Sequence, residues 1–130
     1  MNNREIKFRA LSDEVPNSDF IYGLLYYNVV GEYIIKRIDG ISKPCKPNTI
    51  GMYSGLSDKY GTKIYEGDIV KCGYGIGAVV FNHGCFMVEW IDDKEANIEF
   101  LFSRDGHRVR KGEDVFEVIG NIHQNSEFLK

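Results

Sequence analysis

Long apolar segments and an excess of basic residues are both missing from this sequence. No apolar run approaches the roughly 18 residues that a membrane-spanning helix needs, and residues 1–9 lack the apolar core of a signal peptide. The net charge of −3 leaves no global positive field that would hold a polyanion or an anionic membrane surface. We therefore expect a soluble, cytoplasmic protein that does not bind membranes.

Residues that form disulfides or bind metals are also scarce. The three cysteines form no CxxC pair and are odd in number, which argues against a disulfide framework and a cysteine-based zinc site. The three histidines lack the spacing of metal ligands, although the fold could still bring them together. We expect no metal and no cofactor. The residues concerned are Cys45, Cys72, Cys85, His83, His107 and His123.

Catalytic motifs are absent, and two short-range pairs remain as candidates for chemistry. The sequence has no GxSxG, HExxH or Walker motif. Glu66 and Asp68 flank Gly67 and could bind a divalent cation or act as an acid/base pair, but Asp at a strand entry commonly accepts hydrogen bonds from loop N–H groups. His83 and Cys85 could form an imidazole–thiolate pair, but no third group orients them. We favour the structural interpretation of both pairs and expect no enzymatic activity.

Two more segments resemble functional motifs only in part. The run from Gly73 to Gly77 is rich in glycine like a phosphate-binding loop, but a β-type sequence follows it where such a loop needs a helix. Asp92, Asp93 and Glu95 form an acidic cluster, which a solvated loop explains. Neither segment predicts a binding site.

A local cluster of basic residues lies between positions 104 and 111. Basic side chains near the aromatic residues Phe100 and Phe102 are typical of sites for single-stranded nucleic acid. The same charges also suit an edge strand, where they discourage unwanted pairing, and acidic residues nearby dilute the positive field. We favour the solvated edge strand and keep nucleic-acid binding as the alternative. The cluster consists of Arg104, His107, Arg108, Arg110 and Lys111.

The composition and the apolar patterns favour β-strands. Aromatic residues make up 13% of the chain, and they suit a pleated surface. Alternation near the N-terminus predicts a half-buried strand that starts near Glu5, with Lys7 and Arg9 on its polar face. Residues 20–27 are apolar on both faces, which predicts a strand covered on both sides. Residues 33–38 are expected to complete a hairpin with this strand, and a loop is expected at 40–47. Further short strands are expected at 49–53, 64–65, 68–72, 78–81, 85–90, 98–102 and 116–122. A helical turn is expected at 127–130.

Three segments of the chain carry a resemblance to a known family. They read REIKFRA at 4–10, GMYSGLSDKYGTKIYEGDIV at 51–70 and FEVIGNIHQNSEFL at 116–129, and together they resemble the YopX family of small phage and prophage proteins. The resemblance implies a β-rich protein with an SH3-like roll in its C-terminal part, acting in the cytoplasm of the bacterial host. It implies no particular reaction. We expect the structural turns of the middle segment at Gly55, Gly61, Gly67 and Asp68.

These patterns predict a mainly β fold. An N-terminal β-hairpin unit, residues 1–50, is expected to pack on an SH3-like β-roll or barrel, residues 51–130, with a short C-terminal helical turn. We expect a phage or prophage accessory protein that serves as a non-enzymatic interaction or self-assembly module. The expected partner is a second copy of the chain, or else a host protein. The expected oligomer interface consists of Phe20, Tyr22, Leu24 and Tyr26, because a strand that is apolar on two faces needs a cover.

Overall fold

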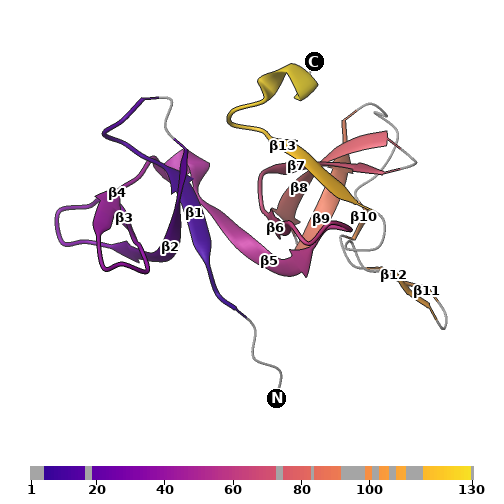
Figure 1. Cartoon of the computed structure of the whole chain (residues 1–130), viewed down its shortest axis with the longest axis horizontal. Coiled ribbons are helices and arrows are strands. Elements are labelled where there is room, and N and C mark those ends of the chain that lie inside the picture. The colour runs from indigo at the N-terminus through magenta and orange to yellow at the C-terminus, as the bar shows by residue number, and fades with distance from the viewer. Residues whose placement is uncertain are drawn as a thin grey trace. The chain divides into compact units, whose positions relative to one another are not determined.

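The computed structural model contains two compact units. They are Met1–Tyr53 and Ser54–Lys130, coloured from indigo to magenta and from magenta to yellow in Figure 1. The structure describes residues 5–16, 19–72, 75–82, 84–91, 99–100, 103–105, 108–110 and 116–129. No helix within these ranges has the length and apolarity to cross a membrane.

The N-terminal unit is an antiparallel sheet in the order β4-β3-β2-β1-β5. Its central strand β2 pairs with β1 through residues 20–23 and with β3 through residues 24–27. The last strand of the unit, β5, runs on past Tyr53 into the second unit, where β6 (Lys63–Tyr65) pairs with it as the sixth strand of the same sheet. The elements are β1 (Phe8–Leu11), β2 (Phe20–Tyr27), β3 (Tyr33–Lys36), β4 (Ser42–Pro44), the 3-10 helix η1 (Pro47–Thr49) and β5 (Gly51–Ser57).

The β2–β3 hairpin ends in a turn that Asn28 organises. The Asn28 side-chain oxygen accepts hydrogen bonds from the backbone N–H groups of Val30 (3.1 Å) and Glu32 (2.8 Å). The Asn28 N–H donates to the Glu32 carbonyl at 2.9 Å. Asn is favoured in such turns because its side chain can satisfy backbone donors two or more residues ahead. The turn is therefore closed by its own local bonds.

One face of the N-terminal sheet covers a small core. Ala10, Ile35 and Cys45 are buried together. Thr49 supports this core from η1, because its hydroxyl accepts a hydrogen bond from the Leu11 N–H at 2.9 Å and donates to the Lys46 carbonyl at 2.7 Å. The partly buried side chains that complete the core are Phe8, Ile21, Leu25 and Ile50.

Three expectations for this unit were wrong. Arg9 is not on a solvated face, since only 5% of it is exposed and its guanidinium lies 4.1 Å from the centroid of the Phe20 ring. Residues 40–47 are not an unpaired loop, because β4 pairs with β3 and places Pro44 opposite Ile34. β4 is the last strand in the sheet order, where a proline is tolerated because it lacks only the backbone N–H; the Pro44 carbonyl still accepts a hydrogen bond from the Asp13 N–H at 3.1 Å. The face of β2 that carries Tyr22 is exposed rather than covered.

The second unit is built on a five-stranded antiparallel sheet in the order β10-β9-β8-β7-β13. A separate two-stranded ribbon joins β11 to β12. The elements are β6 (Lys63–Tyr65), β7 (Asp68–Cys72), β8 (Gly75–Asn82), β9 (Cys85–Trp90), β10 (Glu99–Phe100), β11 (Ser103–Asp105), β12 (Arg108–Arg110), β13 (Glu117–Asn121) and the 3-10 helix η2 (Ser126–Leu129).

The core of the second unit lies on one face of this sheet. It consists of buried aliphatic side chains and Phe116, whose ring centroid is 6.2 Å from that of Trp90. The prediction of a mainly β protein is confirmed, with two main antiparallel sheets, but the strands do not close into a barrel. The fully buried members of the core are Ile64, Val70, Val79, Val88 and Phe116.

Candidate functional site

The predicted oligomer interface is divided between two places in the N-terminal unit. Tyr22, Leu24 and Tyr26 follow each other on one face of β2, and all three are exposed. Phe20, on the same face, is half-buried. Phe20, Tyr22 and Leu24 line a cavity, whereas Tyr26 lies next to the turn at the end of the hairpin. The strand therefore offers two different surfaces.

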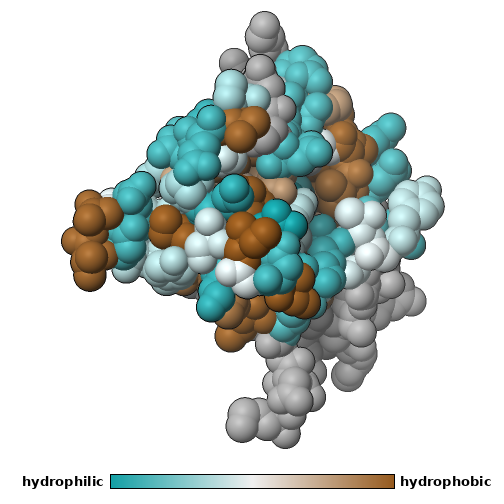
Figure 2. Space-filling view, turned by 60° about the vertical axis from the view of Figure 1, so that its left-hand side comes forward, coloured by the Kyte–Doolittle hydropathy of each residue, from teal (hydrophilic) through white to brown (hydrophobic). Residues whose placement is uncertain are grey.

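The end of the β2–β3 hairpin exposes apolar side chains on both faces. Val29 and Val30 in the turn have 103% and 74% of their surface exposed. The rings of Tyr27 and Tyr33, which are in register, lie with their centroids 4.9 Å apart. In Figure 2, brown apolar residues reach the surface in several groups among teal polar ones. We call this region the hairpin tip, and it consists of Tyr26, Tyr27, Val29, Val30 and Tyr33.

Sequence reasoning missed the two valines of this surface. Turns are normally made of Gly, Pro, Asn, Asp and Ser, so two adjacent β-branched apolar residues between Asn28 and Gly31 were the available signal. Val29 and Val30 are not needed to close the turn, since Asn28 does that with its own side chain. Their exposure therefore calls for another explanation.

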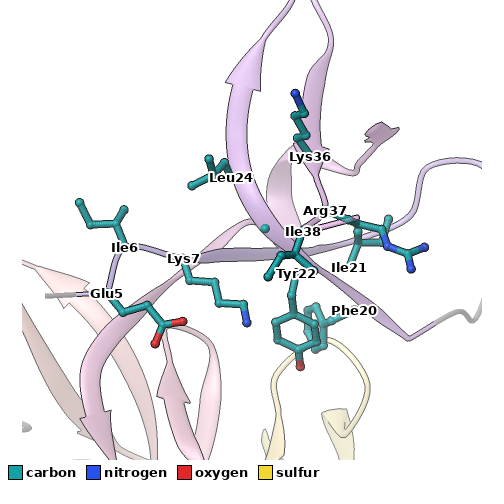
Figure 3. Close-up of a pocket in the computed structure, with 11 residues that line it drawn as sticks. Glu5, Ile6, Lys7, Phe20, Ile21, Tyr22, Leu24, Lys36, Arg37 and Ile38 are labelled. Atoms are coloured by element: carbon teal, nitrogen blue, oxygen red, sulfur yellow. The ribbon is translucent and has the colours of Figure 1, made fainter. Parts of the chain in front are cut away.

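The cavity opens beside the middle of β2 and has a volume of about 800 Å³. It forms where β2 changes partners, because β1 pairs with residues 20–23 and β3 with residues 24–27. Lys7, Lys36 and Arg37 are among its lining residues. In Figure 3, Lys7 extends toward the Tyr22 ring, whereas the side chains of Lys36 and Arg37 point away from that ring. The lining residues are Glu5, Ile6, Lys7, Phe20, Ile21, Tyr22, Gly23, Leu24, Lys36, Arg37 and Ile38.

Cations contact the aromatic rings of this cavity. The Lys7 Nζ atom lies 5.7 Å from the centroid of the Tyr22 ring, while the Arg9 guanidinium covers the Phe20 ring. Both arrangements are in the range of cation–π attraction. The Phe20 and Tyr22 ring centroids are 6.3 Å apart with the ring planes at 58°. The site thus combines positive charge with ordered aromatic surface.

Gly23 is required by the close approach of β3 to β2. A side chain at this position would run into the backbone carbonyl of Lys36 and would lie 3.1 Å from the Arg37 Cα atom. Glycine alone lets two backbones approach this closely without rearrangement. The absence of a side chain at Gly23 therefore allows Lys36 and Arg37 to reach the rim of the cavity.

The turn residues of the middle segment are part of the framework of the second unit. Gly55, Gly61 and Gly67 all have positive φ angles, between +86° and +93°. At the entry to β7, the Asp68 carboxylate accepts a hydrogen bond from the Tyr65 N–H at 2.7 Å and is buried. The Gly67 carbonyl accepts a bond from the Ile122 N–H at 2.9 Å. These contacts connect the start of β7 to the end of β13.

Among the residues that the structure describes, the other chemical candidates do not assemble into a site. Asp68 is engaged with the backbone, and the part of the chain that the structure describes holds no group of three or more His, Cys, Asp or Glu side chains able to bind a metal ion. Cys85 is paired in register with Asn82 at the end of the β8–β9 hairpin. Several predicted residues lie outside the described ranges, namely Gly73, His83, Asp92, Asp93, Glu95, Phe102, His107 and Lys111.

The cysteine in the core of the N-terminal unit is unsuited to nucleophilic chemistry. Cys45 is buried, and its thiol donates a hydrogen bond to the Tyr33 carbonyl at 3.4 Å. Burial raises the pKa of the Cys45 thiol, and the nearby Asp13 carboxylate raises it further. Since the thiolate is the nucleophile, Cys45 serves as a small apolar core residue.

Part of the basic cluster lies on the two-stranded ribbon of β11 and β12, whose backbone register places Arg104 opposite Val109 and Asp105 opposite Arg108. His107 and Lys111 lie outside the described residues.

The chain matches a known protein family in sequence and a solved protein in structure. A family model described as YopX protein matches residues 7–130. No curated protein matches the chain. Among solved structures, the chain is similar to the crystal structure of protein EF1440 from Enterococcus faecalis, with a TM-score of 0.57 and 24% identity over 98% of this chain and 100% of that chain. At this identity the similarity shows a shared fold.

Proposed function

The chain belongs to the YopX family, and we propose that this member is a non-enzymatic phage or prophage accessory protein that assembles with a second copy of itself. One observation carries the proposal. The hairpin tip exposes Val29, Val30 and three tyrosines, and Glu32 is the only charged residue between Phe20 and Ile35. Depletion of charge with enrichment of tyrosine is typical of the buried centre of a protein interface.

A second copy is the partner that this surface fits best. In a two-fold contact the same patch faces itself, so any repeated charge would face a like charge. The five members of the hairpin tip are uncharged, and the one charged residue beside them, Glu32, accepts a hydrogen bond from the Asn28 side chain at 3.2 Å. Burial of such a surface is favourable, at about 25 cal/mol for each Å² of apolar area removed from water.

The turn is also pre-organised for binding. Asn28 makes two side-chain bonds to the backbone of Val30 and Glu32, and a third bond from its Nδ2 to the Glu32 carboxylate at 3.2 Å. A surface that is already ordered loses little conformational entropy on association. The valines therefore project from a turn that need not rearrange.

Sedimentation velocity of the purified protein at tens of micromolar tests this proposal. We expect a dimer for the parent chain and a monomer for Val30→Asp, since a buried charge without a partner opposes association. Val15→Asp is the matched control, because Val15 is also an exposed apolar residue of this unit but lies outside the hairpin tip. A monomeric parent, or equal dissociation of both variants, contradicts assembly through the tip.

A further inference from the structure

The side of β2 that faces β1 becomes an open sheet edge beyond Gly23. The β1 ladder ends where Phe8 lies opposite Gly23, while residues 24–27 pair with β3 on the other side of the strand. Figure 3 shows the chain at Ile6 leading away from β2. Within the described part of the chain, the second half of β2 therefore has a strand neighbour on one side only.

One hydrogen bond of the hairpin fixes which backbone groups this edge presents. Successive residues of an antiparallel strand direct their N–H and C=O groups to opposite edges. The Asn28 N–H donates to the Glu32 carbonyl at 2.9 Å, so the even-numbered residue Tyr26 is also turned to β3. The odd-numbered residues Leu25 and Tyr27 therefore direct their N–H and C=O groups to the open edge.

A second hydrogen bond, on the other side of β1, leads to the same assignment. The Lys7 carbonyl accepts a bond from the Tyr53 N–H of β5 at 2.8 Å, so the next residue, Phe8, is turned to β2. Its partner Gly23 is then turned to β1. Leu25 lies two positions further along β2 and has the same orientation.

Other edges of the described sheets are protected against pairing with a further strand. In β4, Pro44 has no N–H group to offer. In β13, the Val118 N–H donates to the Asp58 carboxylate at 2.9 Å, and in β6 the Tyr65 N–H donates to the Asp68 carboxylate at 2.7 Å. Proteins usually protect their edges in such ways, with charges or prolines among the devices. The sequence of β2 holds neither a charged residue nor a proline.

We propose that two copies of the chain pair their β2 strands edge to edge and antiparallel, about a two-fold axis at Tyr26. This inference rests on the proposed self-assembly and specifies the atoms that join the copies. In this register Leu25 lies opposite the partner's Tyr27, and the two residues exchange N–H···O bonds. Tyr26 lies opposite the partner's Tyr26. Because both copies use the same edge, the assembly closes as a dimer.

The same register accounts for exposed apolar side chains on either side of the contact. It brings the partner's hairpin turn, which begins at Asn28, level with Leu24. Leu24 and Ile6 line the cavity at this point and are 59% and 54% exposed. Val29 and Val30 follow Asn28 in the partner's turn, where they cover this apolar opening. A second copy thus supplies both a strand for the edge and a cover for the cavity.

Cysteine cross-linking of a Tyr26→Cys variant measures the register. Opposed residues at a position without ladder hydrogen bonds have Cα atoms about 4.5 Å apart, which a disulfide can span. Val29→Cys is the matched control from the same tip, since Val29 lies level with the partner's Gly23. Six positions then separate the two Val29 residues, roughly 20 Å of extended chain, well beyond the limit of about 7 Å for a disulfide.

Oxidised glutathione serves as the electron acceptor in this experiment, and the parent chain with its three cysteines gives the background. We expect about fivefold or more covalent dimer from Tyr26→Cys than from Val29→Cys. Equal linking of the two variants, or more from Val29→Cys, overturns the proposal, because two tips that meet head-on would bring the valines together. Sedimentation of the reduced variants shows that both still assemble.

Hydrogen exchange of the parent chain, followed residue by residue by NMR, gives a readout that depends on no variant. We expect the amides of Leu25 and Tyr27 to exchange about tenfold or more slowly in the dimer than after dilution to the monomer. The Tyr26 amide is the internal control, because it already pairs with Ile34 within each copy, and its rate should change by less than about twofold.

The outcomes separate the edge pairing from assembly itself. A dimer in which Leu25 and Tyr27 exchange as fast as in an unstructured chain removes the edge pairing and leaves assembly through the hairpin tip. A parent chain that is monomeric at tens of micromolar removes both proposals, and it is the result expected if the strand of an unrelated protein occupies this edge.

Discussion

Among single residues, Asp58 makes the most far-reaching contacts in the second unit. One carboxylate oxygen accepts hydrogen bonds from the N–H groups of Tyr60 and Thr62, both at 2.8 Å. The other accepts a bond from the Val118 N–H at 2.9 Å, across sixty positions of sequence. The Asp58 carboxylate is buried while it accepts these three bonds. The carboxylate therefore joins the turn before β6 to β13.

Replacement of Asp58 by alanine should lower the free energy of unfolding by about 1–3 kcal/mol, because it removes the acceptor of three hydrogen bonds, one of which reaches Val118. Asp58→Asn should lower the free energy of unfolding by less, because the amide oxygen can still accept the two bonds of the turn. The bond from the Val118 N–H is lost, since the amide NH₂ group cannot accept it. Urea denaturation measures both changes. Asp39→Ala is the control, because its ion pair with Arg37 is exposed and contributes about 0–1 kcal/mol. Equal effects at the two positions would contradict the role given to Asp58.

At the scale of elements, β2 connects the strands of the N-terminal unit, because its first half pairs with β1 and its second half with β3. The exchange occurs at Gly23 and Leu24, since Gly23 pairs with Phe8 of β1 and Leu24 pairs with Lys36 of β3. The close approach of the Lys36 backbone to Gly23 fixes where β3 leaves the strand. The exposed strand face and the cavity rim both follow from this geometry.

Substitution of Gly23 by alanine should therefore destabilise the protein by about 1–3 kcal/mol, the usual range when atoms are forced into a packed site. Hydrogen exchange should show faster exchange in β2 and β3. Leu24→Ala serves as the neighbouring control, because Leu24 is 59% exposed and surface substitutions usually change stability by about 0.5 kcal/mol or less. A Gly23→Ala protein as stable as the parent would show that the two backbones can separate freely.

For the whole molecule, the strand β5 belongs to both units. Gly51 and Met52 pair with β1, and the same strand continues to Ser57 in the second unit. Because β5 is one continuous strand, loss of its pairing in one unit is expected to weaken its pairing in the other. The two units are thus expected to unfold together.

Trp90 allows this expectation to be measured. It is the single tryptophan of the chain and packs on the core of the second unit, so its fluorescence reports on that unit. We expect Gly23→Ala, in the first unit, to lower the urea midpoint seen by Trp90 as much as the midpoint seen by far-ultraviolet circular dichroism. A Trp90 transition that stays in place while the first unit unfolds earlier would show two independent units.

The sequence alone determined those features that depend on neighbours along the chain. The strands at 20–27, 68–72 and 85–90 have the predicted bounds, because a short apolar run bounded by turn residues is a signal local to the sequence. The expected helical turn at 127–130 appears as η2, one residue earlier. The family resemblance, carried by contiguous segments, is confirmed over residues 7–130.

Only the tertiary structure decided which faces and charges come together. Arg9 follows the pattern of an exposed residue, but Phe20 of the next strand covers it. Pro44 lacks a backbone N–H and so argues locally against a strand, yet it lies in β4, at the edge of the sheet, where a proline is tolerated. Lys7 and Lys36 are 29 positions apart in the sequence, and they reach one cavity because β2 exchanges partners between them. The periodicity of a strand is a local property of the sequence, whereas the burial of one face of that strand depends on which distant strand packs against it.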